Sequence, residues 1–501
     1  MSISGKSLVA GVWLGSEAEG QFQAYNPIAG ENLAQRYYNA SRTDIDQAAL
    51  QAAAAFPSFS QLNVEQRAQF LETIGEEILA LGDELLETTA LETGLPMMRL
   101  QGERMRTVNQ LRMFAQYIRE QANAEVLDEA DPAREPLPKP ETRLRHIALG
   151  PVAVFGASNF PYAFSTAGGD TASALAAGCP VVVKGHPAHP GTSELVAQAI
   201  DKAINTCGLH SGVFSLFQSS KPEASIELVQ HPAIQAVGFT GSIRVGQLLQ
   251  KACWERTQNI PFYGELGAVN PQVVMPAMAN DNAQNIAQGL VDSLVMGNGQ
   301  FCTNPGLWLV PESAGEFRQA ASEAIRNAST TALLTQGISA AYSAATIKLA
   351  QTEGVELLAG NEVEQPHFSA AKLFSTSASE FLANRELHEE VFGPAALMVS
   401  YRDEEELHSV IASLEGQLTA SIHGLEQDLA QAGNLSQQLA HKVGRLIYNQ
   451  MPTGVEVCYS MNHGGPFPSS TDVRSTSVGA AAYQRFVRPI CYQNAPAHLL
   501  S

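Results

Sequence analysis

The sequence predicts an α/β protein whose parallel sheets are covered by helices on both faces. From Gly150 onward, short apolar runs bounded by Gly and Pro alternate with helical stretches at 165–178, 191–206, 221–230 and 243–257. The runs are PVAVFGAS, PVVVKGH, GVFSLFQ and AIQAVGFTGS, and their β-branched residues suit strands that are buried on both faces. A second alternating region spans about 266–460. Because ligands bind beyond the carboxyl ends of parallel strands, the residues that end these runs are candidate site residues.

Helical and extended segments flank the alternating regions. Residues 44–124 have apolar positions at spacings of three and four, and Asn63 precedes an acid-rich first turn as a helix cap. Residues 126–146 are rich in Pro and charge, and the stretch TRLRHIALG at their end alternates like an exposed strand. They are interpreted either as a linker or as a projecting hairpin that pairs with a partner subunit. The tail, 475–501, ends in apolar and aromatic residues that suit packing against another surface.

The composition excludes several classes of function. The chain has 501 residues, with 30 Lys and Arg against 50 Asp and Glu, so its formal net charge is −20. A protein this acidic is a poor candidate for binding nucleic acid or an anionic membrane through its net field. No apolar run approaches the roughly 20 residues that cross a bilayer, and the first residues lack the features of a signal peptide. Six cysteines occur without a C-x-x-C pair, so we expect a reduced, cytoplasmic protein with neither a disulfide framework nor a metal site.

Cys302, Glu265 and Asn159 are the candidate catalytic residues. Cys302 lies in GNGQFCTNPG, where the flanking glycines predict an irregular backbone that brings amides near a reacting atom; a buried structural cysteine is the alternative. Glu265, in YGELGAVNP, has apolar and Gly neighbours. We therefore expect a carboxylate in a partly dry crevice, with a raised pKa that suits a base, rather than a surface glutamate. Asn159, in FGASNFP, can donate to a developing oxyanion together with the Cys302 amide, although such an Asn is also common in turns.

A second group of residues suits a ligand that carries phosphate. The stretch FTGSIRVG, residues 239–246, is typical of a strand, a turn and a helix. Gly241 relaxes the turn, Ser242 caps the helix, and Gly246 allows close packing. The helix N-terminus suits a pyrophosphate, although the pattern is not G-x-G-x-x-G. Lys184 ends the run VVVK and can meet a ribose or phosphate oxygen.

Taken in order, these motifs resemble those of the aldehyde dehydrogenase superfamily, and they span essentially the whole chain. They are SNFP with Asn159, VVVK with Lys184, FTGSIRVG, ELG with Glu265, GQFCT with Cys302, and EEVFGP with Glu390 and Phe392. Within the superfamily the chain is most similar to the α-ketoglutaric semialdehyde (2,5-dioxovalerate) dehydrogenases and the related bacterial fatty-aldehyde dehydrogenases. That similarity rests on KGHPAHPGTSE (184–194), RLIYNQMPTGVEV (445–457), HGGPFPSSTD (463–472) and RFVRPICYQN (485–494).

The resemblance implies an NAD(P)-dependent oxidation of an aldehyde to a carboxylic acid. Cys302 would attack the aldehyde carbon, Asn159 and the Cys302 amide would stabilise the oxyanion, and hydride would pass to nicotinamide. Glu265 would activate the water that cleaves the thioester. Glu390 would position the nicotinamide ribose, and Phe392 belongs to the same cofactor-binding motif. Two other classes stay open: a CoA-acylating dehydrogenase or cysteine hydrolase, which would not need Glu265, and a non-enzymatic scaffold, which would tolerate the loss of Cys302.

The resemblance also implies a domain organisation. The expected parts are a Rossmann-like cofactor domain (1–125 and 147–265), an α/β catalytic domain (266–460) and a small β extension (126–146 and 475–501). Members of the family join through that extension as dimers or tetramers, so we expect a homodimer or homotetramer. The expected partner is a small-molecule aldehyde.

One position departs from the family pattern and bears on the cofactor. Many NAD-using members carry a Glu three residues after the strand-end Lys, where it binds the adenine ribose hydroxyls. Here that position is Pro187. Without the carboxylate a 2′-phosphate meets no repulsion, and Lys184 and His186 can stabilise it. NADP is therefore the expected cofactor, with NAD also possible.

The expected substrate is 2,5-dioxopentanoate, oxidised to 2-oxoglutarate, and a medium- or long-chain aliphatic aldehyde is the alternative. A substrate carboxylate needs a local cation in so acidic a protein. Arg474 follows HGGPFPSSTDV, in the stretch where the family lines its aldehyde entrance, and the hydroxyls of Ser469, Ser470 and Thr471 lie beside it in sequence. We expect this group to hold the carboxylate, with a surface or interface arginine as the alternative.

Overall fold

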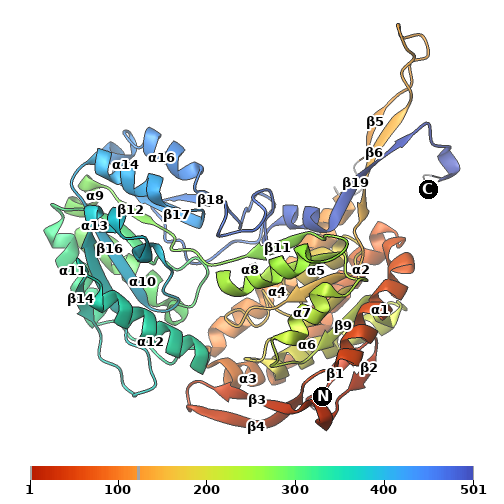
Figure 1. The fold of residues 1–501 in the computed structure, drawn as a ribbon, viewed down its shortest axis with the longest axis horizontal. Helices are drawn as coiled ribbons and strands as arrows, with labels where there is room; N and C mark the ends of the chain where they lie inside the picture. Colours follow the sequence, from red (N-terminus) through yellow and green to blue (C-terminus); the bar gives the residue numbers. More distant parts are fainter. Residues whose placement is uncertain (1–2, 121–124, 500–501) are drawn as a thin grey trace.

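Two seven-stranded sheets, each covered by helices, organise the protein (Figure 1). The computed structural model describes residues 3–120 and 125–499. In the first sheet the strands of the predicted alternating region run parallel, and two N-terminal strands add an antiparallel edge. Its order is β11 (Phe262–Glu265), β10 (Ala236–Thr240), β7 (Val152–Phe155), β8 (Val181–Lys184), β9 (Phe214–Phe217), β1 (Ser7–Val9) and β2 (Val12–Leu14).

The helices expected around this sheet are present. Asn63 caps α2 as predicted. Its side chain accepts a hydrogen bond of 2.9 Å from the Gln66 backbone N–H, and the Gln66 side chain accepts one from the Asn63 backbone N–H. Residues 121–124 of the predicted helical region lie outside the described residues. The helices are α1 (Arg42–Ser60), α2 (Val64–Ala80), α3 (Gly82–Thr93), α4 (Met97–Glu120), α5 (Gly169–Ala176), α6 (Pro190–Thr206), α7 (Glu223–Gln230) and α8 (Ile243–Trp254).

The second sheet confirms the second alternating region. It is parallel except for β14, which pairs antiparallel with β15. Its order is β14 (Glu356–Gly360), β15 (Lys372–Ser377), β16 (Ala395–Tyr401), β13 (Leu307–Pro311), β12 (Gln272–Val274), β17 (Gln417–His423) and β18 (Val443–Tyr448). Its helices are α9 (Pro276–Asp281), α10 (Ala283–Val295), α11 (Gly315–Arg326), α12 (Gln336–Gln351), α13 (Ala378–Ala383), α14 (Glu404–Ser413), α15 (Glu426–Leu429) and α16 (Gly433–Ala440).

The strand register places the candidate residues of the first sheet at one edge. Phe155 at the end of β7 pairs with Lys184 at the end of β8, and Thr240 at the end of β10 pairs with Glu265 at the end of β11. Because all four strands are parallel, their carboxyl ends face the same side. The sequence argument from strand ends is therefore confirmed in three dimensions.

A three-stranded arm projects from the body (Figure 1). It consists of β5 (Val126–Asp128), β6 (Thr142–Ala148) and β19 (Val487–Gln493), all antiparallel. Residues 126–146 therefore form a projecting hairpin and not a linker, and its pairing with a partner subunit stays a prediction. The tail joins the arm only from Val487, because Phe486 is fully buried in the core beside the first sheet. The limits of the domains stay a prediction.

The remaining elements are short. A two-stranded sheet pairs β3 (Gln21–Asn26) with β4 (Glu31–Tyr38). No helix in the described part of the chain combines the length and the apolar character needed to cross a membrane. The 3-10 helices are Glu17–Glu19, Ser211–Val213, Met296–Gly299, Arg385–His388, Ala480–Phe486 and Ala497–Leu499.

Candidate active site

Cys302 lies in a loop that its neighbours hold tightly. Before it, Gly299 has a φ of 71°, and a Cβ there would lie 2.2 Å from the backbone carbon of Gly393, so only glycine fits. After it, the Asn270 side chain donates hydrogen bonds to the carbonyls of Cys302 (2.8 Å) and Asn304 (2.9 Å). The predicted irregular backbone is therefore present and is anchored on both sides of the thiol.

His463 joins the two predicted catalytic residues, and the sequence analysis did not anticipate it. Its Nε2 lies 3.3 Å from the Cys302 Sγ and 2.8 Å from the Glu265 Oε1. The imidazole is fully buried and Glu265 is 4 % exposed. The three ligand-type atoms of Glu265, Cys302 and His463 all lie within 4.8 Å of one another. The structure thus forms a compact thiol, imidazole and carboxylate cluster.

The segment that follows β18 holds this cluster in place. The His463 backbone N–H donates to the Thr476 hydroxyl at 2.7 Å, and the Ser477 N–H donates to the His463 carbonyl at 2.8 Å. The Ser477 hydroxyl then donates to the second oxygen of Glu265. A histidine inside a Gly- and Pro-rich motif was the available signal, but its partners are 161 and 198 residues away in the chain. Only the fold brings them together.

The expected raised pKa of Glu265 is wrong. Burial raises the pKa of this carboxyl, but the charge of His463 and hydrogen bonds from His463, Ser477 and Cys302 outweigh burial and lower the pKa below its usual value. Burial and the nearby charge of Glu265 raise the pKa of the Cys302 thiol well above its usual range. The resting site therefore favours a neutral thiol beside an ionised carboxylate.

The two nitrogens of His463 have different surroundings. Nδ1 is buried and has no hydrogen-bond partner among the described residues. An unpaired buried N–H costs more than an unpaired ring lone pair, so we infer that Nε2 carries a proton. Nε2–H then donates to Glu265, with the Cys302 sulfur also within reach.

Asn159 borders the Cys302 loop. Its Nδ2 donates to the Gln300 carbonyl at 2.8 Å, and its backbone carbonyl accepts a 2.6 Å hydrogen bond from the Arg99 side chain. An amide nitrogen carries two N–H groups, so a second donor stays available beside the loop. This placement fits the predicted oxyanion role without testing it.

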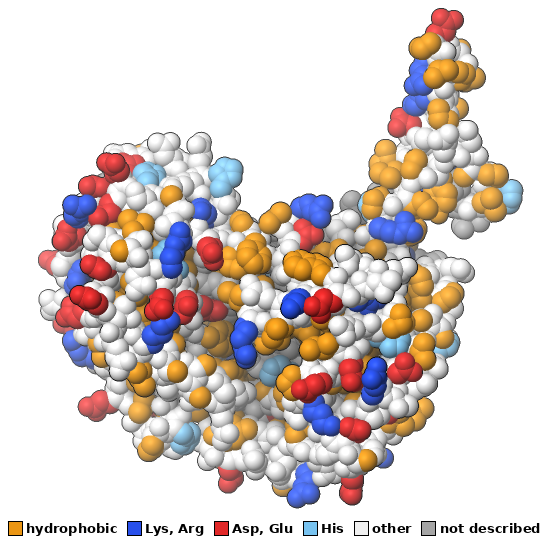
Figure 2. Space-filling model, viewed as in Figure 1, with side chains coloured by type: hydrophobic (Ala, Val, Ile, Leu, Met, Phe, Trp, Pro, Cys, Tyr) orange, Lys and Arg blue, Asp and Glu red, His pale blue; other side chains and the backbone are white. Residues whose placement is uncertain are grey.

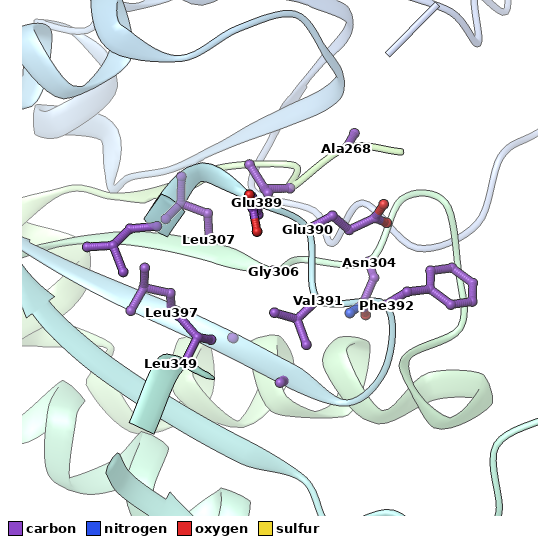
Figure 3. Close-up of a pocket in the computed structure, with 14 residues that line it drawn as sticks. Ala268, Asn304, Gly306, Leu307, Leu349, Glu389, Glu390, Val391, Phe392 and Leu397 are labelled. Atoms are coloured by element: carbon purple, nitrogen blue, oxygen red, sulfur yellow. The ribbon is translucent and has the colours of Figure 1, made fainter. Parts of the chain in front are cut away.

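Glu390 and Phe392 line a pocket together with Ala268 and Asn304 (Figure 3). The Glu390 carboxylate is so close to Gly267 that a Cβ there would lie 2.1 Å from Oε2. Burial raises the pKa of Glu390 to about 8, although the Ala268 N–H donates to it. Its charge also contributes to the raised pKa of Cys302, so this acid lies within electrostatic reach of the thiol.

The predicted phosphate-binding turn adopts the expected structure. The Gly241 N–H donates to the Glu265 carbonyl at 3.1 Å. The Ser242 side chain caps α8 by accepting from the Val245 N–H. At Gly246 a Cβ would come within 2.3 Å of Leu266, so the predicted close packing is confirmed.

The two basic residues at the end of β8 differ. Burial lowers the pKa of Lys184 to about 8, and no hydrogen bond or ion pair of its ammonium occurs within residues 3–120 and 125–499. Burial together with the charges of His189 and Lys184 lowers the pKa of His186 well below its usual value. His186 is therefore neutral near pH 7, and its role in stabilising a 2′-phosphate stays a prediction.

The expected carboxylate clamp is not formed. The Arg474 side chain is 86 % exposed and pairs with Asp472, with 3.2 Å between Nε and Oδ1. Ser470 forms a backbone bridge with Glu265, but its hydroxyl donates to the Asp472 carbonyl. The Thr471 hydroxyl donates to the Phe262 carbonyl. Arg474 therefore lies at the surface, where water screens its charge. The hydroxyls of Ser470 and Thr471 hydrogen-bond to backbone carbonyls and so stabilise the segment before it.

Comparisons with known sequences agree with the geometry. The sequence model of the Aldehyde dehydrogenase family matches residues 13–488. The chain is 46 % identical over 505 residues to "Alpha-ketoglutaric semialdehyde dehydrogenase 2" of Azospirillum brasilense, covering 100 % of this chain and 96 % of that protein. It is 45 % identical over 474 residues to "Alpha-ketoglutaric semialdehyde dehydrogenase" of Acinetobacter baylyi, covering 93 % and 89 %.

Comparison with solved structures supports the fold. Betaine aldehyde dehydrogenase from Staphylococcus aureus in complex with NAD+ matches with a TM-score of 0.85 at 20 % identity, over 99 % of this chain and 96 % of that one. Aldehyde dehydrogenase from Bacillus cereus matches with a TM-score of 0.84 at 21 % identity, over 98 % and 96 %.

Proposed function

The chain belongs to the aldehyde dehydrogenase family, and from that premise we propose that it oxidises 2,5-dioxopentanoate to 2-oxoglutarate with NADP. The observation that carries the chemistry is the contact of His463 with both Cys302 and Glu265. A thiol nucleophile needs a proton acceptor and a stabilised thiolate, and the cluster supplies both. The substrate is proposed from the curated relatives, whose names describe that semialdehyde.

Acylation starts at the sulfur. The Glu265 carboxylate takes the thiol proton, and the Nε2–H of His463 turns toward the thiolate that remains. The Cys302 sulfur attacks the aldehyde carbon: an S–C bond forms and the carbonyl π pair moves to oxygen. The Asn159 side chain and the Cys302 amide donate to that oxyanion.

Two further changes complete the reaction. Nicotinamide, held beside Glu390, would supply the hydride acceptor that converts the adduct on Cys302 into a thioester. Glu265 releases the proton it took from the thiol to solvent. The ionised Glu265 then removes a proton from water as the water oxygen attacks the thioester carbon, and the C–S bond breaks to return the thiolate. His463 and Ser477 keep Glu265 ionised for this step.

The chain offers residues that fit a dinucleotide. Lys184 ends a parallel strand with an ammonium that has no counter-ion in the described chain, Ser242 begins α8, and Glu390 lies beside the cluster. Lys184 would hold an adenine ribose or its 2′-phosphate, the start of α8 would hold the pyrophosphate, and Glu390 would hold the nicotinamide ribose. Pro187 supplies no carboxylate to repel a 2′-phosphate, which supports the NADP preference.

The projecting arm supports a homodimer or homotetramer. Its described residues expose large apolar side chains, which gather on the arm in Figure 2. They include Val126 (61 % exposed), Leu127 (43 %), Leu137 (69 %) and Leu144 (39 %). Burying them against a second copy would be favourable.

Steady-state kinetics with an aldehyde panel and both cofactors tests the proposal. We expect the highest kcat/KM with 2,5-dioxopentanoate and NADP. A clear preference for hexanal or longer aldehydes would support the aliphatic alternative instead. Cys302→Ala should abolish oxidation while leaving the thermal unfolding transition in place, because no other thiol lies in the cluster. Activity that survives this substitution would overturn the assignment of the nucleophile.

A further inference from the structure

Arg106 lies next to the apolar residues that border the catalytic cluster. It comes from α4, and its guanidinium carbon is 5.3 Å from the centroid of the Phe164 ring. The Phe164 ring lies 6.2 Å from the His463 ring, and His463 contacts Cys302. A chain of two aromatic rings therefore links Arg106 to the nucleophile. The apolar group around Phe164 consists of Ala157, Ala163 and Val478, with Phe160, Val455, Val457 and Met461 packed against it.

One end of the Arg106 guanidinium has no hydrogen-bond partner. Nη2 donates to the Val455 carbonyl at 3.1 Å, whereas Nη1 is buried and unpaired. Within residues 3–120 and 125–499, it is the one terminal guanidinium nitrogen among the buried side-chain atoms that lack a partner. A cationic N–H that has lost water and found no acceptor is costly, and the contact with Phe164 offsets only part of that cost. An anionic ligand would supply the missing acceptor.

The other arginines near the cluster already have partners. Arg99 donates to the Asn159 carbonyl at 2.6 Å. Arg445 uses both terminal nitrogens on the carbonyls of Gly454 (2.9 Å) and Pro452 (2.6 Å), where it fastens a loop. Among these three arginines of the described chain, Arg106 is the one with a buried terminal nitrogen that has no hydrogen-bond partner.

The acid nearest to Arg106 along the helix interacts with it through charge, but in the described chain the two side chains form no hydrogen bond or ion pair with each other. Glu103 lies one turn earlier, and its Oε1 accepts from the backbone N–H groups of Tyr162 (2.9 Å) and Ala163 (3.1 Å). Burial raises the pKa of Glu103, and the charge of Glu103 partly offsets the burial that lowers the pKa of Arg106. The positive charge of Arg106 is close enough to Cys302 to oppose the rise in its pKa. The field at the nucleophile therefore includes a contribution from Arg106.

We propose that Arg106 is the specificity-determining residue of the substrate site, and that it binds the carboxylate of a short oxo acid while Cys302 attacks the aldehyde carbon at the other end. This inference rests on the proposed function. It assigns to Arg106 the carboxylate-binding role that the exposed Arg474 does not fill. Four C–C bonds separate the two end carbons of 2,5-dioxopentanoate, roughly 5 Å when extended. A guanidinium binds a carboxylate through directed, charge-assisted N–H···O bonds.

Paired substrates of equal chain length test the proposal. In Arg106→Met, kcat/KM for 2,5-dioxopentanoate should fall roughly 10- to 100-fold, chiefly through KM, because a charge-assisted contact is lost. Pentanal has the same length and no carboxylate, so its kcat/KM should change by no more than about threefold. Arg106→Lys keeps the charge without the planar fork and should recover part of the loss.

A binding measurement separates this inference from the proposed function. The measured quantity is the rate at which iodoacetamide alkylates Cys302. Bound 2-oxoglutarate should lower this rate in the wild type but not in Arg106→Met. This readout needs no turnover, so it tests Arg106 even if 2,5-dioxopentanoate proves a poor substrate. Arg112→Met is the matched control, because Arg112 is an exposed arginine on the same helix. It should leave both the kinetics and the protection unchanged.

Three results would overturn the proposal. Equal losses with pentanal and 2,5-dioxopentanoate would mean that Arg106 only supports the fold around Val455. Unchanged protection by 2-oxoglutarate in Arg106→Met would mean that another group binds the carboxylate. If Arg106→Met does not fold, Arg106→Lys decides: pentanal kinetics that fall as far as those of the oxo acid would refute the specificity role.

Discussion

Replacing His463 by Phe removes the donor that keeps Glu265 ionised while retaining a planar ring. In the wild type the imidazole Nε2 lies 2.8 Å from a carboxylate oxygen in a residue that is 4 % exposed. A hydrogen bond to a buried charge contributes about 1.5–3 kcal/mol, which corresponds to a rise of about 1–2 units in the pKa of Glu265. The Ser477 hydroxyl stays as the other donor, so the Glu265 carboxylate keeps one side-chain hydrogen bond in the variant.

The assay is the pH profile of turnover. Because Glu265 must be ionised to accept a proton, the acid limb of kcat in His463→Phe should move upward by about 1–2 pH units. Ser477→Ala removes the second donor and should move the limb in the same direction. If neither variant moves the limb, Glu265 is not the base and the inferred role of His463 is wrong.

Unfolding measurements give an independent check with a defined sign. In the wild type the folded pKa of Glu265 lies below its usual value of 4.5, so its contribution to stability is present above that value and is lost as the pH falls through the lower folded pKa. In His463→Phe burial raises the folded pKa, so the variant loses stability as the pH rises through it. The difference in unfolding free energy should therefore be about 1.5–3 kcal/mol near pH 7 and should shrink in acid. A difference that does not depend on pH would indicate a packing defect instead.

Three further substitutions test other parts of the site. Glu265→Gln should slow steady turnover, and because this residue also accepts the thiol proton, the burst of reduced cofactor should slow as well; a burst at wild-type rate would restrict Glu265 to hydrolysis. Pro187→Glu should shift the ratio of kcat/KM values from NADP toward NAD, since a carboxylate would repel the 2′-phosphate; an unchanged ratio would place that phosphate elsewhere. Gly299→Ala should lower the free energy of unfolding by about 2–4 kcal/mol, because its Cβ would meet the Gly393 backbone at 2.2 Å and its φ is 71°. The control Gly208→Ala has a φ of 64° and nothing within 4 Å, so it should lose only about 1 kcal/mol in urea unfolding; equal losses would exclude the clash.

Local patterns in the sequence were enough to predict the sheets, the helices around them and the edge where the site lies. Alternation of apolar and polar residues reports which face of an element is buried, and Gly and Pro mark where it ends. That is why the end of β8 at Lys184, the end of β11 at Glu265 and the cap at Asn63 were all predicted. The motif around Cys302 was informative for the same reason, because its glycines act on the backbone next to them.

Contacts between distant segments decided the rest. His463 meets Cys302 across 161 residues and Glu265 across 198, and the contact with Glu265 reversed the expected direction of the Glu265 pKa. Arg474 looked suitable by its neighbours in sequence but points into solvent, whereas Arg106, on a helix far from any motif, lies beside the cluster. A pKa and a donor's availability depend on burial and on partners through space, and neither quantity is encoded in the spacing of residues along one segment.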